Sequence, residues 1–510
     1  MVKLEGELAT VVRKELGIKD KKVFDFSEED LKKVSQIRIS KNDIKNLEYF
    51  PNVKIVDLDL FPSINDEDLL VISNSLPNIA SLKIKEQNEL YEVDFSTFAN
   101  LKELALIHND NLRSFKIVKL LDRFTFYDNK DFNRCDQIVS YLISNPDAKV
   151  TLDVAHYIEV ARLLYRLHED ATVLERITWV ECSGLRKFVM HQFTHGEIES
   201  LIGAVSSIAS KYIYVSDGEV EKFGVLYRWM IRNVSFVNED EPQGENITNI
   251  NNIYKVFNFR KGGRLSYAKA FQILLSYAGI ESAVVYSYGA LDTIGYYNGK
   301  KVYSLLGDSD YALLRVKLDG RYYYCDVTWD SMVSKLKYFD ELRLLLISKD
   351  ELKLRHKLVG EDEITKSYSY RGDDSDDLIM FADNRIEEVD KLFNDIERLD
   401  PSIYGLKLES ELIKARMKQL KTEKNEPNSN EKTIEAELEE LNNNLDEDQA
   451  ELYRMNNFKQ GIYDNYAQVL KSRYLYNQQY SNEEIKKDLD NRKELFLISD
   501  YVYTILSKIL

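Results

Sequence analysis

Cysteine is scarce in this chain, and the few cysteines lie far apart. There are three in 510 residues: Cys135, Cys182 and Cys325. An odd, sparse set of this kind does not form a disulfide framework, and no pair of them has the spacing of metal ligands. The sequence therefore predicts a protein of a reducing compartment, with no structural disulfide and no bound metal.

The chain also has fewer basic than acidic residues, and it has no long apolar runs. Lysine and arginine number 69 against 86 aspartate and glutamate residues, a formal net charge of −17. Nucleic-acid binders need basic surface to displace counterions, so nucleic acid is not the expected partner. No window reaches the ~18 consecutive apolar residues of a membrane span, and the N-terminus lacks the apolar region of a signal peptide. We expect a cytoplasmic protein, with non-classical export left open.

The chain is too long for one hydrophobic core, and its composition is that of a globular protein. Hydrophobic residues make up 44% and charged residues 30% of it. No phosphate-binding loop is present, and no cofactor is expected. The patterns described below predict a multidomain α+β protein with domains at 1–190, 191–368 and 383–510, and an acidic linker at 369–382.

The first domain carries a repeat in which apolar residues alternate and are followed by a turn-forming residue. The first copy runs Val34-x-x-Ile37-x-Ile39-x-x-Asn42-x-Ile44, and further copies begin at Val53, Ile79, Leu101, Leu121 and Leu174. Alternation predicts strands, and a repeat that cannot bury its apolar face alone must stack on its neighbours. The pattern resembles bacterial, internalin-like leucine-rich repeats behind a helical cap. The resemblance implies a solenoid whose exposed strand face binds a protein, or serves only as a scaffold.

Two stretches of the central domain carry a second resemblance. The first is Lys-Gly-Gly-Arg-Leu-Ser-Tyr-Ala-Lys-Ala-Phe at 261–271, and the second runs from Val316 to Asp-Val-Thr-Trp-Asp at 326–330. The frame resembles the transglutaminase-like superfamily, whose members have a papain-type fold and a Cys-His-Asp triad. Aligned on that frame, Arg264 occupies the nucleophile position and Tyr311 the base position. Only Asp326, followed by Trp329, matches the family's site.

The resemblance thus implies that the site has lost its catalytic nucleophile and base. A guanidinium cannot act as a nucleophile or a base, and an unperturbed phenol titrates near ~10. We expect Arg264, Tyr311, Asp326 and Trp329 to form either a structural plug or a binding site for an anionic ligand or an acidic peptide. Cys325 neighbours Asp326 on a strand, so its side chain should point away from the cleft into the core.

The last domain reads as helical. Leucines and isoleucines between Ile434 and Leu452 have the spacing of an antiparallel helical hairpin or a short coiled coil. This module could join two copies of the chain into a homo-oligomer, and either it or the repeat face could bind a protein partner. Lys-, Asn- and Ile-rich usage is typical of an AT-rich bacterial genome.

From these patterns we expect a catalytically inactive, transglutaminase-like protein that acts as a protein-interaction scaffold. One alternative is an active cysteine-type transglutaminase or peptidase whose catalytic groups lie at other positions. A second alternative is a carbohydrate- or peptide-binding module that uses the tyrosine-rich strands around Tyr322–Tyr324.

Overall fold

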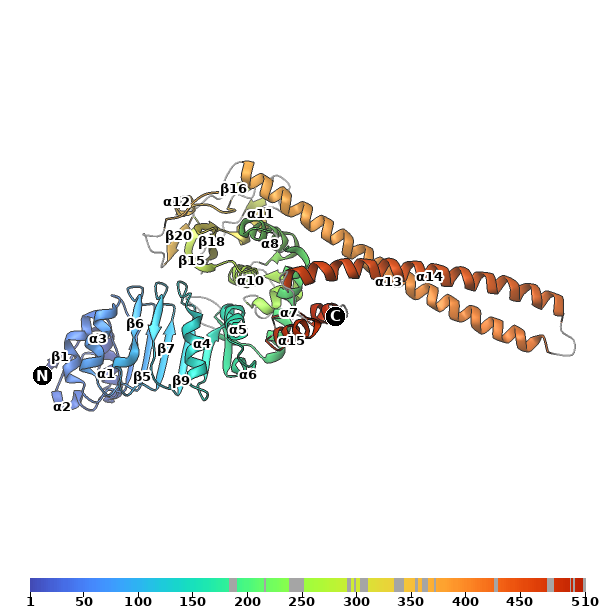
Figure 1. Ribbon diagram of the computed structural model, residues 1–510. Coiled ribbons are helices and arrows are strands. Elements are labelled where there is room, and N and C mark those ends of the chain that lie inside the picture. Colours follow the sequence, from blue (N-terminus) through green and yellow to red (C-terminus); the bar gives the residue numbers. More distant parts are fainter. Residues whose placement is uncertain are drawn as a thin grey trace.

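The computed structural model covers residues 1–510 (Figure 1). The description concerns all residues except 183–189, 215–216, 238–251, 291–294, 298–299, 303–310, 334–343, 354–355, 360–365, 371–372, 426–429, 475–480, 496, 499 and 508–510.

An eight-stranded, mostly parallel sheet forms the N-terminal part of the molecule. Its strands lie in the order β12-β11-β10-β9-β7-β5-β4-β3, and all neighbours are parallel except β11 and β12. Their bounds are β3 Gln36–Arg38, β4 Ile55–Leu58, β5 Ser81–Lys85, β7 Glu103–Ile107, β9 Arg123–Tyr127, β10 Val150–Asp153, β11 Ile177–Cys182 and β12 Met190–Gln192. Two small pairs accompany the sheet: β1 Val2–Lys3 with β2 Asp25–Phe26, and β6 Glu92–Asp94 with β8 Ser114–Lys116.

One apolar side chain from each of the seven parallel strands is in register with the next and is buried, which explains why these segments form a sheet. The row consists of Ile37, Val56, Leu82, Leu104, Phe124, Val150 and Ile177. Beyond the strand ends, buried amides satisfy the turning backbone. The Asn109 N–H donates to Asn129 Oδ1 at 2.9 Å, and the Gln87 N–H donates to Asn109 Oδ1 at 3.1 Å.

Short helices connect the strands of this part. They are α1 Gly6–Glu15, α2 Glu28–Leu31, α3 Asp66–Ser75, α4 Cys135–Ser144, α5 Tyr157–Arg166 and α6 Thr172–Glu175, with 3₁₀ turns at η1 Lys41–Tyr49, η2 Phe95–Thr97 and η3 Val154–His156. The helices α4 and α5 pack on each other beside the last parallel strands (Figure 1).

The prediction of a leucine-rich-repeat solenoid over 1–190 is wrong. The structure shows an eight-stranded, mostly parallel sheet with an antiparallel edge strand, within a mixed α/β protein that ends in helices. The repeat pattern located the strands because alternate apolar residues do enter the core. It could not specify the connections, which range from 3₁₀ turns to helices of ten residues.

The central part combines helices with a second, antiparallel sheet in the order β19-β18-β15-β20. The strands of the central part are β13 Ser235–Phe236, β14 Lys261–Gly262, β15 Ser282–Ala290, β16 Gly295–Tyr297, β17 Lys300–Val302, β18 Tyr311–Leu318, β19 Arg321–Cys325 and β20 His356–Val359. Of these, β13 pairs with β14 and β16 with β17, outside the four-stranded sheet. The helices of this part are α7 His195–Tyr212, α8 Glu219–Asn233, α9 Ile253–Phe259, α10 Arg264–Tyr277, α11 Val327–Val333 and α12 Lys349–Lys353. Helix α10 packs against both β15 and β18.

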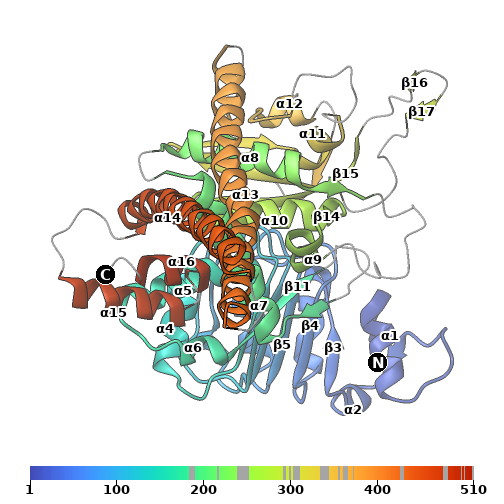
Figure 2. The same cartoon turned by 90° about the vertical axis from the view of Figure 1, so that its right-hand side faces the viewer.

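Four helices end the chain: α13 Asp373–Glu423, α14 Glu431–Tyr474, α15 Asn482–Glu494 and α16 Asp500–Ser507. Helix α13 begins inside the stretch 369–382, where we expected a linker, and packs on α8. Gly224 permits this close approach, because a Cβ there would lie 2.5 Å from Leu378 Cδ1. Helices α15 and α16 lie near α5 and α7 (Figure 2). Among the described residues, no helix has the length and apolar character needed to cross a membrane.

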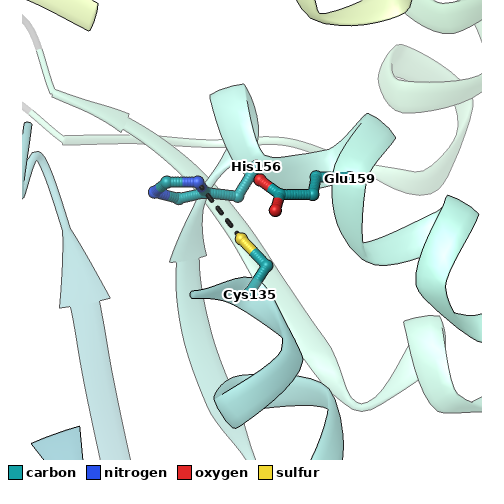
Figure 3. Close-up of side chains that lie close together, drawn as sticks. All are labelled: Cys135, His156 and Glu159. Atoms are coloured by element: carbon teal, nitrogen blue, oxygen red, sulfur yellow. Dashed lines mark hydrogen bonds between the residues drawn. The ribbon is translucent and has the colours of Figure 1, made fainter. Parts of the chain in front are cut away.

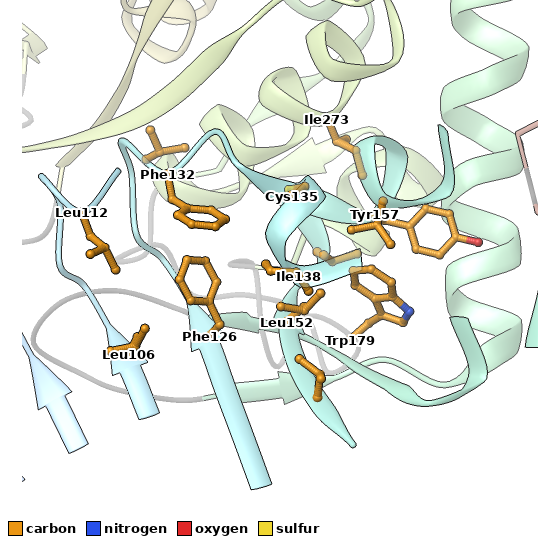
Figure 4. Packing of buried hydrophobic residues seen from close by; sticks show 14 of the residues in the cluster. Leu106, Leu112, Phe126, Phe132, Cys135, Ile138, Leu152, Tyr157, Trp179 and Ile273 are labelled. Carbon is orange, nitrogen blue, oxygen red and sulfur yellow. The ribbon is translucent and has the colours of Figure 1, made fainter. Parts of the chain in front are cut away.

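The two sheets share one core, which continues from the first sheet into α10. Ile273 of α10 joins the cluster that contains Cys135, Tyr157 and Trp179 (Figure 4). Charged contacts border this apolar junction. Lys269 Nζ of α10 lies 3.6 Å from Asp153 Oδ2 at the end of β10, and both side chains are buried. Tyr286 donates to Asp128 at 2.7 Å.

We expect Lys269→Met to lower the free energy of unfolding by about 3–5 kcal/mol, because it leaves the buried Asp153 carboxylate without its cation. Urea denaturation measures this change. The double variant Lys269→Met/Asp153→Asn is the matched control and should recover most of the loss. An unchanged unfolding midpoint in the single variant would contradict the assigned role of the pair.

Candidate active site at Cys135, His156 and Glu159

Three side chains with nucleophilic or basic atoms converge where α4 meets α5. Cys135 is the first residue of α4, His156 ends η3, and Glu159 lies in the first turn of α5. Cys135 Sγ and His156 Nδ1 lie 3.6 Å apart, within hydrogen-bonding range for sulfur (Figure 3). One atom from each of the three residues lies within 4.8 Å of the other two.

Local sequence and packing explain this placement. The residues His156 and Glu159 are three apart at a helix start, so their side chains project from neighbouring positions. The imidazole is packed against aromatic rings, with the Phe126 ring centroid 6.1 Å away and the Phe132 centroid 6.5 Å away. The position of Cys135 at the start of α4 places its thiol near backbone N–H groups that have no partner within the helix.

The thiol rests in its protonated form. Burial raises the pKa of Cys135 well above its ordinary value, and the negative charge of Glu159, together with its hydrogen bond to the thiol, raises it further. Cys135 is fully buried, whereas His156 and Glu159 are half-buried. Deprotonation of Sγ therefore requires a base in contact with it, and Nδ1 of His156 occupies that position.

A cavity of about 720 Å³ adjoins these residues at the junction of the two sheets. His156 and Glu159 line it, together with charged side chains of both signs. Those that come from the central part include Lys269 and Arg315, and Arg315 forms an ion pair with Asp131 across the junction. A polar ligand that enters this cavity would meet the imidazole and carboxylate that flank the thiol.

The same three donor atoms also form a ligand set suited to a transition metal ion such as Zn²⁺, which binds thiolate, imidazole and carboxylate. Elsewhere in the described ranges, no other group of three or more histidine, cysteine and carboxylate residues converges in this way. The expectation of no metal, which considered only pairs of cysteines, did not weigh this mixed set.

The site residues expected from the sequence, Arg264, Tyr311, Asp326 and Trp329, also lie close together. Their cluster is in the central part of the chain, separate from the group at Cys135. Tyr311 donates to Asp326 Oδ2 at 2.5 Å, and the Arg264 guanidinium carbon lies 5.9 Å from the centre of the Tyr311 ring. The N–H of Trp329 donates to Asp326 Oδ1 at 2.9 Å. Burial raises the pKa of Asp326 to about 6, although the Tyr311 hydrogen bond opposes that shift. That these four residues bind a ligand stays a prediction.

The predicted loss of catalytic residues is contradicted by the group at Cys135. The prediction of an inactive scaffold rested on Arg264 and Tyr311 standing where a thiol and an imidazole would stand. A cysteine and a histidine in contact do exist, 21 residues apart in the sequence. The spacing His156-x-x-Glu159 was a usable signal for part of this group. No sequence signal linked Cys135 to it, because only the packing of α4 against α5 brings the thiol there.

Comparisons with known proteins assign this chain to no family. No family model and no curated protein matches this chain. The predicted membership of the transglutaminase-like superfamily without catalytic residues is corrected by the group at Cys135, and the predicted internalin-like repeats are corrected by the mostly parallel sheet.

Two solved structures show distant likeness. One is described as a "putative protease" from Parabacteroides distasonis, with 18% identity, a TM-score of 0.17 and coverage of 28% of this chain and 30% of that one. The other is a "putative cysteine protease" from Cytophaga hutchinsonii, with 13% identity, a TM-score of 0.19 and coverage of 35% and 53%. These scores are too low to establish a shared fold.

The buried carboxyl of Glu181 makes stability depend on pH. Burial raises the pKa of Glu181 to about 8, although the charge of Lys269 opposes that shift. In the unfolded chain this carboxyl titrates near ~4.3. Between these values the folded state holds a proton that the unfolded state has lost, so stability falls as pH rises. Burial acts in the same direction on Asp110, whose pKa is raised to about 7.

We expect Glu181→Gln to flatten this dependence and to stabilise the protein at about pH 8 by up to about 4–5 kcal/mol. Urea unfolding measured from about pH 5 to pH 8 checks this. Glu199→Gln, a change at an exposed position of α7, is the control. Parallel curves for the wild type and Glu181→Gln would show that Glu181 is not protonated in the fold.

Removing the Tyr311 hydroxyl should leave the buried Asp326 carboxyl short of a donor. We expect Tyr311→Phe to reduce the free energy of unfolding by about 1–3 kcal/mol. The reduction should be larger above the Asp326 pKa of about 6 than below it, because a protonated carboxyl needs the donor less. Tyr323→Phe on the neighbouring strand is the matched control, and an equal effect at both pH values would argue against the assignment.

Proposed function

We propose that this chain is a cysteine peptidase in which Cys135 is the nucleophile and His156 the general base. The observation that carries the proposal is the 3.6 Å contact between Cys135 Sγ and His156 Nδ1 at the start of α4. A nucleophile in contact with a base is the arrangement that acyl-transfer enzymes of unrelated folds share. The adjoining cavity supplies a place for a substrate.

The residues define the steps. His156 Nδ1 accepts the thiol proton as Sγ attacks a carbonyl carbon, so that a C–S bond forms while the imidazole becomes cationic. Collapse of the tetrahedral intermediate breaks the C–N bond, and the imidazolium gives its proton to the departing amine. Water, deprotonated by the same imidazole, then attacks the thioester carbon and releases the acid and the thiol. The dipole of α4, at whose first residue Cys135 lies, favours negative charge on sulfur during attack.

Glu159 has a role different from that of the third residue of a serine-protease triad. Its negative charge, close to the thiol, raises the pKa of Cys135. It thereby keeps the resting thiol neutral and, once the proton has moved, faces the imidazolium at short range. We therefore assign Glu159 to stabilising the cation on His156.

Access to the thiol is the main requirement of this mechanism. The cavity is lined by His156 and Glu159 but not by Cys135, which is fully buried. A carbonyl carbon must come within about 3–3.5 Å of Sγ to react. Turnover therefore needs a movement of these side chains, or of the first turn of α4, that opens the thiol to the cavity.

Alkylation of the native protein tests this proposal directly. Iodoacetamide, in the presence of a chelator that frees the thiol of any metal, should modify Cys135 in the folded wild type, as shown by mass spectrometry of its peptides. His156→Ala should slow that reaction at least about tenfold, because general-base assistance contributes 10²–10⁴-fold in enzymes. A peptidyl acyloxymethyl ketone should label the wild type and Cys325→Ser but not Cys135→Ser.

Cys325 is the matched control because it is also fully buried, and burial likewise raises its pKa. Circular dichroism should show that Cys135→Ser remains folded. Modification of Cys135 only after denaturation, at the same rate as Cys325, would refute the proposal.

A further inference from the structure

The donor atoms of Cys135, His156 and Glu159 are of three different kinds: a sulfur, an imidazole nitrogen and a carboxylate oxygen. They all lie within 4.8 Å of one another, and the three side chains point toward one another (Figure 3). A thiolate, an imidazole and a carboxylate are the ligand types that proteins use for Zn²⁺ and its neighbours in the first transition row. Hard cations such as Mg²⁺ and Ca²⁺ prefer oxygen ligands alone, so they fit this set poorly.

One distance in the group already has the length that a zinc site requires. Cys135 Sγ and His156 Nδ1 lie 3.6 Å apart. In a tetrahedral site with Zn–S near ~2.3 Å and Zn–N near ~2.0–2.1 Å, the sulfur and the nitrogen are separated by about 3.6 Å. The thiol is fixed by burial in the core, and the imidazole is packed against Phe126 and Phe132. The two donors therefore form one preset edge of the site.

Glu159 is the adjustable ligand. Its side chain is half-buried and lies on the wall of the cavity, as that of His156 does. Because its oxygen is already within 4.8 Å of the other two donors, a side-chain rotation that moves it by about 1 Å completes the set. Three protein ligands leave a fourth coordination position, which faces the cavity and can hold water.

Charge also favours a divalent cation at this place. A thiolate and a carboxylate together carry two negative charges, so a bound divalent ion leaves no net charge in a largely buried region. The cations Lys269 and Arg315 on the cavity wall are ion-paired with Asp153 and Asp131, which offsets their repulsion of a metal. Binding requires deprotonated ligands: the S–H bond breaks as the S–Zn bond forms, and the proton leaves to water.

We propose that Cys135, His156 and Glu159 bind one Zn²⁺ ion and that the bound ion switches off the peptidase. The second part rests on the proposed function. With zinc in place, an electron pair of Sγ is bonded to the metal and Nδ1 can no longer accept a proton. The nucleophile and the general base are therefore lost together, and removal of the ion restores both.

Cobalt titration of the full chain tests the site, because Co²⁺ accepts the same ligands as Zn²⁺ and its absorption reports them. After a chelator has been applied and removed, one equivalent of Co²⁺ should give the intense visible bands of four-coordinate cobalt and a near-ultraviolet band from thiolate-to-metal charge transfer. Added Zn²⁺ should bleach both. Cys135→Ser should lose the near-ultraviolet band, whereas Cys325→Ser should keep it. A band that survives in Cys135→Ser, or a wild type without these bands, would overturn the assignment.

A variant at the half-buried ligand tests the site without disturbing the core. Glu159→Gln should weaken Co²⁺ binding at least about tenfold, because an amide is a poorer ligand than a carboxylate and leaves one positive charge uncompensated. Glu281→Gln is the matched control, since Glu281 also lines the cavity but lies outside the group. Circular dichroism checks that both variants are folded. Equal affinities of the two variants would remove Glu159 from the ligand set and contradict the three-ligand site.

Alkylation separates the metal site from the proposed peptidase. Saturating Zn²⁺ should slow the reaction of Cys135 with iodoacetamide at least about tenfold relative to the metal-free protein, because only a free thiolate is nucleophilic. Cobalt bands together with a thiol that stays unreactive without metal would refute the peptidase and leave the metal site standing. A reactive thiol whose rate Zn²⁺ does not change would leave the peptidase standing and overturn this inference.

Discussion

The arrangement of the two sheets depends on the contact between the buried Lys269 ammonium group and the carboxyl groups around it. Three carboxyl groups, those of Asp128, Asp153 and Glu181, come from the carboxyl ends of β9, β10 and β11 or just beyond them, and the charge of Lys269 acts on each. Parallel strands bring such residues to one edge by topology, and burial of that edge is costly without a cation. Docking of α10 supplies this cation, and Lys269 also lines the cavity at the junction.

The candidate site inherits its position from this junction. The thiol of Cys135 belongs to the helical layer of the first sheet, and the cavity beside it is closed on the other side by α10, β15 and β18. A substrate would therefore contact both parts at once. Loosening of the junction would alter the cavity first, because the cavity is lined by side chains from both the N-terminal and the central part of the chain.

Several local structures could be predicted from the sequence because they depend on neighbours in the chain. The pattern Thr-x-x-Glu predicts the capping box that Thr194 and Glu197 form. The pair Asp-Gly predicts the tight turn at Asp319-Gly320, where both residues have positive φ. The convergence of Tyr311 with Asp326 also follows from adjacent strands. The Cys135–His156 contact and the Lys269–Asp153 pair could not be predicted in this way. They join residues through the packing of helices whose relative placement no local pattern encodes, and the same gap led to the mistaken solenoid.

Helices α13 and α14 form a long antiparallel hairpin, and both of its ends are anchored in the body (Figure 1). Helix α13 starts against α8, and the chain returns after α14 to α15 and α16, where Tyr277 donates to the Leu497 carbonyl at 2.7 Å. The segment between Asp400 and Lys459 is therefore topologically a single long loop. Whole heptads could be inserted into both helices, or removed from them, without rethreading any other segment. The length of this helical hairpin can therefore change during evolution while the fold of the rest of the chain stays the same.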